Sequence, residues 1–203
     1  MTRVRVFVDY QNVYMRARQA FAVQGASYVE GQIKPLRLGL LLVDRGRSVN
    51  AGRQLDSVYV FRGEPSPKHS PRGFAACQRQ VAEWARVSQV VPHTRPLQYL
   101  PSMRSNGQPS AFDAREKGID VLLALAMVMG AVRDEYDVAV LCSADTDLVP
   151  ALEQVHALGK VCETMAWKPP QGYGQRLKVP GGGWCHFLDL KTYELLHDAT
   201  DYS

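Results

Sequence analysis

The sequence lacks the features that mark membrane, secreted and zinc-binding proteins. Its longest apolar run, Val121 to Val132, is interrupted by Gly130 and falls well short of the ~20 residues that a membrane span needs. Only a few hydrophobic residues precede Asp9, so no secretory signal peptide fits. The four cysteines form no CxxC pair and show no zinc-type spacing with histidine, and we expect them to be thiols. These absences predict a soluble, cytoplasmic protein with no membrane partner.

Composition and charge narrow the class of protein only slightly. Hydrophobic residues at 46% and charged residues at 22% are ordinary for a globular protein, which excludes a disordered or collagen-like chain. The net charge is only +4, but 17 of the 24 cationic residues are arginine, whose planar guanidinium suits phosphate. This bias is weak evidence for a nucleic-acid partner, because a solvated arginine-rich surface would explain it equally well.

Apolar patterns divide the chain into alternating strands and helices. Short β-branched and aromatic runs predict strands at residues 4–8, 57–61, 89–91, 138–141, 160–166 and 184–188. Apolar residues at helical spacing predict helices that end near 22 and 44, span 70–87 and 117–132, and run from 148 to 158. The helix over 117–132 is apolar nearly all round, so we expect it to be a buried crossover.

This alternation predicts an α/β fold with a central, mainly parallel sheet covered by helices on both faces. We expect a single domain over residues 1–203, with a core of about 3–166 and a C-terminal strand and helix over 184–197. Two segments rich in Pro and Gly interrupt the pattern. They are 94–112, a loop or distorted hairpin, and the loop 167–183.

Acidic residues stand at the predicted strand ends. Asp9 and Asp145 each follow a strand, and ligands of parallel sheets bind beyond the carboxyl ends of the strands. Asp120 lies in the first turn of the apolar helix, where its carboxylate needs a cationic partner. A shared Mg²⁺ or Mn²⁺ would satisfy these hard oxygen ligands. Three of the acids also have plainer interpretations, because Asp120 could cap its helix or pair with Lys117, Asp147 could be an N-cap or first-turn acid, and Asp9 could be a turn residue.

Three ordered blocks resemble a known family. VFVDYQN at residues 6–12, KGIDV at 117–121 and LCSADTD at 141–147 resemble the signature blocks of NYN domains of the LabA-like type, which belong to the PIN-like nuclease superfamily. The resemblance runs from about residue 3 to residue 166. It implies a three-layer α/β/α PIN-like fold and metal-dependent endoribonuclease activity. The matching positions imply acidic metal ligands at Asp9, Asp120, Asp145 and Asp147, supported by the polar groups of Asn12 and Ser143.

The mechanism that the resemblance implies is in-line attack of a metal-activated water on a backbone phosphate. Asp9, Asp120 and Asp145 would bind the metal directly or through water, and Asp147 would hold a second site or orient the water. Asn12 and Ser143 would hydrogen-bond a ligand or the phosphate. Lys117 is a further candidate phosphate contact, although an ordinary surface lysine is an equal alternative.

The two Pro- and Gly-rich segments carry candidate RNA contacts. Their cations suit phosphates, and their rings could stack on the bases of single-stranded RNA. The candidates are Arg95, Tyr99 and Arg104 in the first segment and Lys168, Tyr173, Arg176 and Lys178 in the second. A solvated loop that merely contains tyrosine is the plainer interpretation. Assembly into a homo-oligomer is compatible with the sequence.

Two other functions compete with a ribonuclease. A non-catalytic RNA-binding or scaffold protein could retain the same fold, although an intact set of four acids argues against it. A haloacid-dehalogenase-like phosphatase also begins with a strand that ends in Asp. That family needs a second acid two residues later, where this chain has Gln11, and it ranks last.

Overall fold

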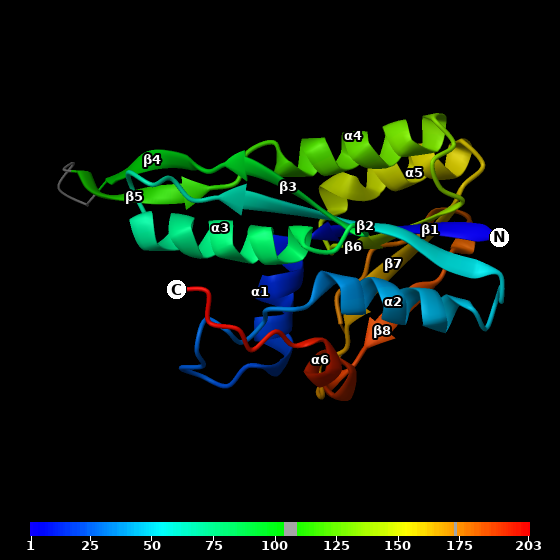
Figure 1. Cartoon of the computed structure of the whole chain (residues 1–203), viewed down its shortest axis with the longest axis horizontal. Helices are drawn as coiled ribbons and strands as arrows, with labels where there is room; N and C mark the ends of the chain where they lie inside the picture. Colours follow the sequence, from blue (N-terminus) through cyan, green and yellow to red (C-terminus); the bar gives the residue numbers. More distant parts are fainter. Residues whose placement is uncertain (104–108, 173) are drawn as a thin grey trace.

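A six-stranded parallel sheet forms the centre of the computed structural model, which describes residues 1–103, 109–172 and 174–203 (Figure 1). Its strands are β1 (Thr2–Asp9), β2 (Arg53–Glu64), β3 (Val90–Pro96), β6 (Val138–Cys142), β7 (Val161–Trp167) and β8 (Cys185–Leu188). Their order is β3-β2-β1-β6-β7-β8, and every neighbouring pair is parallel. The strands predicted from the apolar runs are confirmed.

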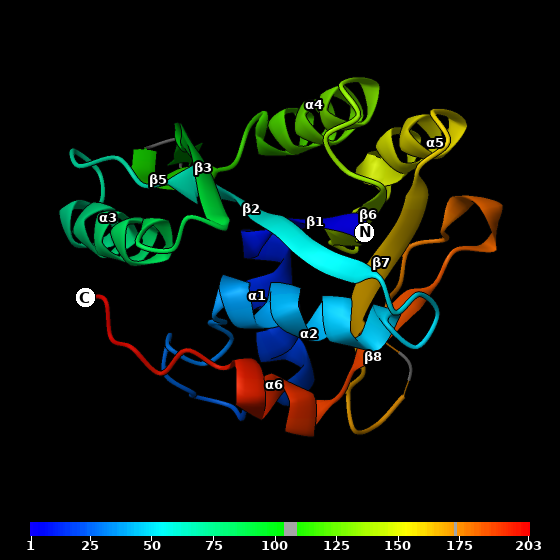
Figure 2. The same cartoon turned by 45° about the vertical axis from the view of Figure 1, so that its right-hand side comes forward.

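Helices cover both faces of this sheet. One face packs against α1 (Tyr10–Phe21), α2 (Pro35–Gly46), α3 (Pro71–Ala85) and α6 (Leu190–Leu196), and the other against α4 (Ile119–Val132) and α5 (Val149–Ala157). Figure 2 shows α4 and α5 on one side of the strands, and α1, α2 and α6 on the other. The fold is therefore the predicted three-layer α/β/α arrangement.

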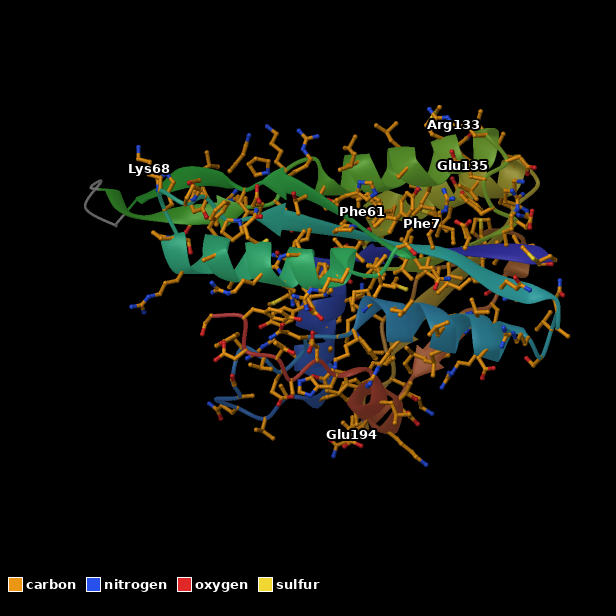
Figure 3. The ribbon with its side chains drawn as sticks, in the orientation of Figure 1. Phe7, Phe61, Lys68, Arg133, Glu135 and Glu194 are labelled. Carbon is orange, nitrogen blue, oxygen red and sulfur yellow. The ribbon has the colours of Figure 1, made fainter. Side chains whose placement is uncertain are left out.

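The central strand β1 is buried from Val4 onward, and the run from Val4 to Val8 is apolar except at Arg5. Val4, Val6 and Val8 face the α1 and α2 layer, because alternate side chains of a strand point to opposite faces. Phe7 faces the other layer, where its ring packs against those of Tyr59 and Tyr136. Phe61 of β2 belongs to the same apolar cluster (Figure 3). Strands buried on both faces read as continuous apolar runs.

The strand order reverses at β1, which positions the candidate site. From β1 the chain adds β2 and β3 on one side, whereas β6, β7 and β8 extend from the other. The carboxyl ends of β1 and β6 lie side by side, since Val8 pairs with Cys142. Crevices at such a reversal are the usual ligand sites of open parallel sheets.

The segment between β3 and α4 is a hairpin rather than an unstructured loop. Its strands β4 (Gln98–Met103) and β5 (Pro109–Arg115) pair antiparallel and extend away from the main sheet beside α3 (Figure 1). The prediction of a loop or distorted hairpin over 94–112 is thereby resolved in favour of the hairpin, and β3 continues to Pro96.

The prediction that α4 is a buried crossover holds for only one face of the helix. Ile119, Leu123 and Met127 are buried against the sheet. The outward face carries apolar side chains that are 40% to 60% exposed, namely Val121, Leu125, Met129 and Val132. The helix forms part of an outer layer, and composition alone cannot tell an outer apolar helix from an inner one.

The cysteines are unpaired, as the sequence predicted. Cys142 in β6 and Cys162 in β7 are buried, and all four cysteines are free thiols. In the part of the chain that the structure describes, no helix combines the length and the apolar content that crossing a membrane demands.

Candidate active site

Asp9 is the residue at which β1 ends and α1 begins. Its side chain caps α1, because one carboxylate oxygen accepts a hydrogen bond from the backbone N–H of Asn12 at 3.1 Å. The other oxygen accepts from the hydroxyl of Ser143 at 2.9 Å. The residue is only 4% exposed. Two donors therefore hold a buried carboxylate at the carboxyl end of the central strand.

The residues after β6 extend this hydrogen-bond network. The side-chain oxygen of Asn12 accepts from the N–H of Ala144 at 3.0 Å, and the hydroxyl of Ser143 accepts from the N–H of Asp145 at 3.1 Å. The carboxylate of Asp145 in turn accepts from the N–H of Asp147 at 3.0 Å. This contact makes Asp145 the N-cap of a short 3-10 helix over Thr146–Leu148. The network joins the first and third sequence blocks side by side.

Asp120 reaches the same edge of the sheet from the first turn of α4. The helix starts after Gly118, whose φ of 78° lies in the left-handed region that glycine adopts without strain. Partial burial raises the pKa of Asp120, and the negative charges of Asp145 and Asp147 raise it further. The second block therefore lies within electrostatic range of the third.

Glu116 is a fifth acid, which the sequence patterns did not identify. Its carboxylate accepts a hydrogen bond from the backbone N–H of Gly63, near the end of β2, at 2.7 Å. Burial and the charge of Asp120 raise its pKa. A Cβ on Gly63 would stand 2.7 Å from the same carboxylate oxygen and 2.3 Å from Cδ2 of Leu97, so a larger residue there would force these side chains to move. The only signal in the sequence was its position just before KGIDV.

The electrostatics of the site centre on Asp9. Burial is the main cause that raises the pKa of Asp9 to about 7, and the charges of Glu116 and Asp120 add to it. The donors Asn12 and Ser143 act in the opposite direction. Within the described residues, none of the five acids takes part in an ion pair. Among the described residues, the site is therefore a group of carboxylates without a direct ion-pair partner.

This donor set suits Mg²⁺ or Mn²⁺, which prefer carboxylate oxygens. Across residues 1–103, 109–172 and 174–203, however, no three His, Cys, Asp or Glu side chains lie close enough together to hold a metal ion. Carboxylates repel one another until a cation neutralises them, so side chains without a cation are expected to stand apart. The chemistry of the donors fits a divalent cation, and the desolvated Asp9 carboxylate is the group that needs one.

Two predicted phosphate contacts border the acids. The guanidinium of Arg95, at the end of β3, lies against Gly118, with Nη1 at 3.4 Å from the position of a Cβ there. Lys117 precedes that glycine and is exposed. Tyr99 is engaged elsewhere, because its ring stacks on His69 and its hydroxyl accepts from the N–H of Ser66 at 3.0 Å.

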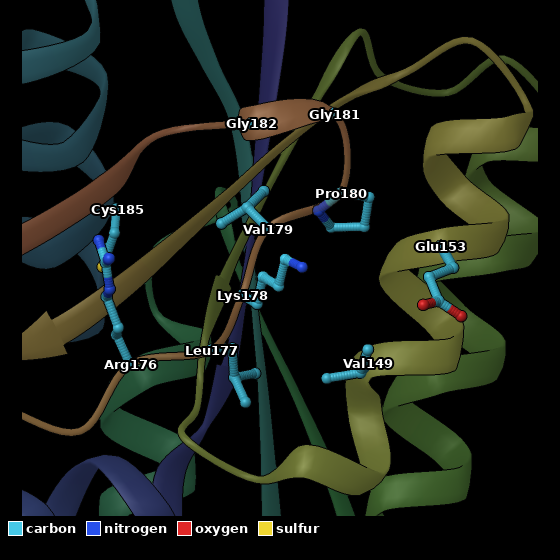
Figure 4. Close-up of a pocket in the computed structure, with 11 residues that line it drawn as sticks. Val149, Glu153, Arg176, Leu177, Lys178, Val179, Pro180, Gly181, Gly182 and Cys185 are labelled. Carbon is cyan, nitrogen blue, oxygen red and sulfur yellow. The ribbon is translucent and has the colours of Figure 1, made fainter.

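The predicted contacts of the second segment lie along a different cavity. Arg176 and Lys178 line a space of about 870 Å³ together with Val149 and Glu153 of α5. In Figure 4 Lys178 lies between the two sides, and Arg176 points toward Cys185 on the side away from α5. Lys168 is exposed at the end of β7. Arg104 and Tyr173 lie outside the described residues.

Comparison with known proteins identifies a family model that matches residues 3–176, described as the NYN domain. No curated protein matches the chain. A solved structure of a protein of unknown function from Vibrio parahaemolyticus RIMD 2210633 is 17% identical, with a TM-score of 0.47. The alignment covers 81% of this chain and 80% of that one.

Proposed function

Because the chain belongs to the NYN domain family, a family of PIN-like nucleases, we propose that it is a ribonuclease dependent on Mg²⁺ or Mn²⁺. Its substrate in this proposal is single-stranded RNA, cut at phosphodiester bonds by water. The observation that carries the proposal is the network from Asn12 and Asp9 through Ser143 to Asp145, which brings two of the three family blocks together. In the described residues, none of the acids near this network has an ion-pair partner.

In this proposal Asp9, Asp120 and Asp145 hold the cation, directly or through water, and Asp147 holds a second site or orients the attacking water. The bound cation would supply Lewis-acid activation of the water and neutralise charge on the phosphate. Glu116 joins this set because the charge of Asp120 raises its pKa and its own charge raises the pKa of Asp9.

The remaining residues position these acids and the RNA. Ser143 and Asn12 hold Asp9 in one rotamer, since donors surround both of its oxygens. Arg95 and Lys117 flank the N-terminus of α4 and would contact the phosphate that lies over the acids. Lys168, Arg176 and Lys178 would bind phosphates farther along the strand of RNA.

A non-catalytic RNA-binding protein is the second candidate. The observation that favours it is the present spacing of the carboxylates, of which no three in the described residues are grouped for a metal. The two candidates differ in whether metal addition leads to cleavage or only to binding.

The test is incubation of the purified protein with a panel of single-stranded RNAs in Mg²⁺, in Mn²⁺ and in chelator. We expect cleavage with either metal and none with chelator. Asp145→Asn should lower the rate by orders of magnitude, whereas Asp44→Asn, at an acid whose side chain is 78% exposed, should not. We would abandon the ribonuclease if Mn²⁺-loaded protein left every RNA intact while binding it as tightly as Asp9→Asn does.

Cytoplasmic location and assembly into a homo-oligomer are further parts of the proposal. The first is consistent with four cysteines that are all free thiols, as in reducing compartments. The second is consistent with the apolar outward face of α4.

A further inference from the structure

A cavity of about 340 Å³ opens beside the acids, and we name it the tyrosine pocket. Its walls come from α1, the segment between α1 and α2, the end of β2, α3 and the C-terminal segment. The residues that matter here are Tyr10, Tyr14, Tyr28, Arg62, Gln80 and Tyr202. Its volume lies at the small end of the range for ligand pockets.

The tyrosine pocket shares its backbone with the acidic site. Tyr10 directly follows Asp9, and Gly63 both lines the pocket and donates its N–H to Glu116. Arg62, which also lines the pocket, directly precedes Gly63 in β2, so the pocket wall continues into the backbone that binds Glu116. A nucleotide whose phosphate lies at the acids would therefore have its sugar and base within reach of this pocket.

Aromatic rings form one side of the tyrosine pocket. The rings of Tyr10 and Tyr14 are stacked, with centroids 6.4 Å apart and planes 19° from parallel. The hydroxyl of Tyr14 donates to the backbone carbonyl of Tyr28 at 2.8 Å, which ties the segment between α1 and α2 to the helix. Tyr28 lines the pocket and is 47% exposed, and its hydroxyl donates to Asp201, so the side chain is held in place while part of it is open to a planar ligand.

The floor of the pocket is a buried polar network. Gln80 is 3% exposed, and its amide donates to the hydroxyl of Tyr10 at 2.8 Å and to Gln32 at 2.7 Å. The guanidinium of Arg62 donates to the side-chain oxygen of Gln80 and lies 5.4 Å from the centre of the Tyr10 ring. A buried amide is stable only when it is hydrogen-bonded. The amide of Gln80 meets this condition, and its contacts fix the positions of Tyr10, Gln32 and Arg62.

Proteins bind single-stranded nucleic acid by stacking aromatic rings on the bases and by contacting the phosphates with cationic side chains. The larger cavity beside α5 has two cations among its lining residues but no aromatic ring. We propose that the tyrosine pocket binds one nucleobase of the RNA next to the phosphate at the acids, with Tyr28 stacking on the base and Arg62 contacting the phosphate. This inference rests on the proposed function for its substrate class.

The test uses binding alone, so that it does not depend on cleavage. Adenosine 5′-monophosphate and ribose 5-phosphate share a sugar and a phosphate and differ by the base. Each is titrated into the purified protein in the presence of Mg²⁺, with the affinity taken from NMR shifts or tyrosine fluorescence. The wild-type chain should bind the nucleotide at least about five-fold more tightly than the sugar phosphate, because stacking on a ring contributes ~1–3 kcal/mol per base.

The variants assign this difference to named side chains. Tyr28→Ala should remove most of the preference for the nucleotide and leave ribose 5-phosphate unchanged, Tyr28→Phe should keep the preference, and Arg62→Gln should weaken both ligands. Val23→Ala, in the same segment and 78% exposed, is the control that should change neither. A thermal melt of each variant establishes that it is folded.

Three results would each contradict base binding in the tyrosine pocket. They are equal affinity for the two ligands, no binding of either, and a preference for the nucleotide that persists in Tyr28→Ala. If the protein binds the base through Tyr28 but cuts no RNA, the base-binding proposal is supported and the ribonuclease proposal is contradicted.

Discussion

The hydroxyl of Ser143 donates a hydrogen bond of 2.9 Å to the carboxylate of Asp9, although 134 residues separate the two in sequence. The same hydroxyl accepts from the N–H of Asp145, so one side chain links two predicted metal ligands. The first contact arises because β1 and β6 are adjacent parallel strands that end at the same level, and the second is a local contact in the turn that follows β6. Ser143 is therefore the clearest positioning residue of the site.

Ser143→Ala should lower RNA cleavage about 10-fold or more, since removing the partner of a metal ligand typically costs 10–100-fold in metal affinity or activity. RNA binding should stay within two-fold. Higher Mg²⁺ should recover part of the activity if the hydroxyl acts through the metal. The control is Ser48→Ala, at an exposed serine whose hydroxyl bonds only to Arg45 in the preceding turn. Equal rates for Ser143→Ala and the wild-type chain would remove Ser143 from the site.

Asp120→Asn should fold normally and should match or exceed the wild-type melting temperature in chelator, because it removes one of several carboxylates that repel. It should also lose the rise in melting temperature that Mg²⁺ or Mn²⁺ produces by binding the native state. Thermal melts with and without metal measure both effects. If Asp120→Asn unfolds the protein, a capping or ion-pairing role for Asp120 becomes the better explanation.

The raised pKa of Asp9 predicts how stability depends on pH. A carboxyl whose pKa is about 7 when folded and ordinary when unfolded binds more protons in the folded state between the two values. Its contribution to the free energy of unfolding is therefore favourable at low pH and is lost as pH rises toward 7. Denaturant titrations in chelator at several pH values should show a shallower decline for Asp9→Asn than for the wild-type chain. An unchanged decline would contradict this assignment.

Two leucines of α4 test the asymmetry of that helix. Leu123 is fully buried and Leu125 is 56% exposed. Leu123→Ala should lower the free energy of unfolding by about 3 kcal/mol, from reduced burial and the cavity that remains. Leu125→Ala should change it by less than about 0.5 kcal/mol in the monomer. Urea unfolding measures both values. A large decrease for Leu125→Ala would mean that another surface covers the outward face.

The cationic residues in the segment between β7 and β8 should contribute to RNA affinity rather than to the cleavage step. Neutralising Lys168, Arg176 and Lys178 together should weaken binding and flatten its salt dependence, by about 0.7 in log–log slope for each phosphate that the protein no longer neutralises. The metal requirement for cleavage should stay the same. Binding measured across a range of KCl concentrations gives the slope. A triple variant with the wild-type slope would place the RNA elsewhere.

The local pattern of the sequence determined the layers and the central part of the site. Short apolar runs that alternate with helical periodicity lead to a parallel sheet, and residues that follow such strands must gather at its carboxyl edge. Asp9, Asn12, Ser143 and Asp145 could be located together for this reason. Each lies shortly after a strand whose pairing the apolar pattern predicts.

Only the tertiary structure decided the rest. Glu116 joins the acids because the glycine at position 63 lets its carboxylate approach the end of β2. The tyrosine pocket closes because Tyr28 meets α1, and because the C-terminal Tyr202 comes to lie beside it. The outward face of α4 is exposed because the helix lies in an outer layer. Contacts between segments far apart in the chain produce these features, and no local periodicity encodes which distant segment will meet which side chain.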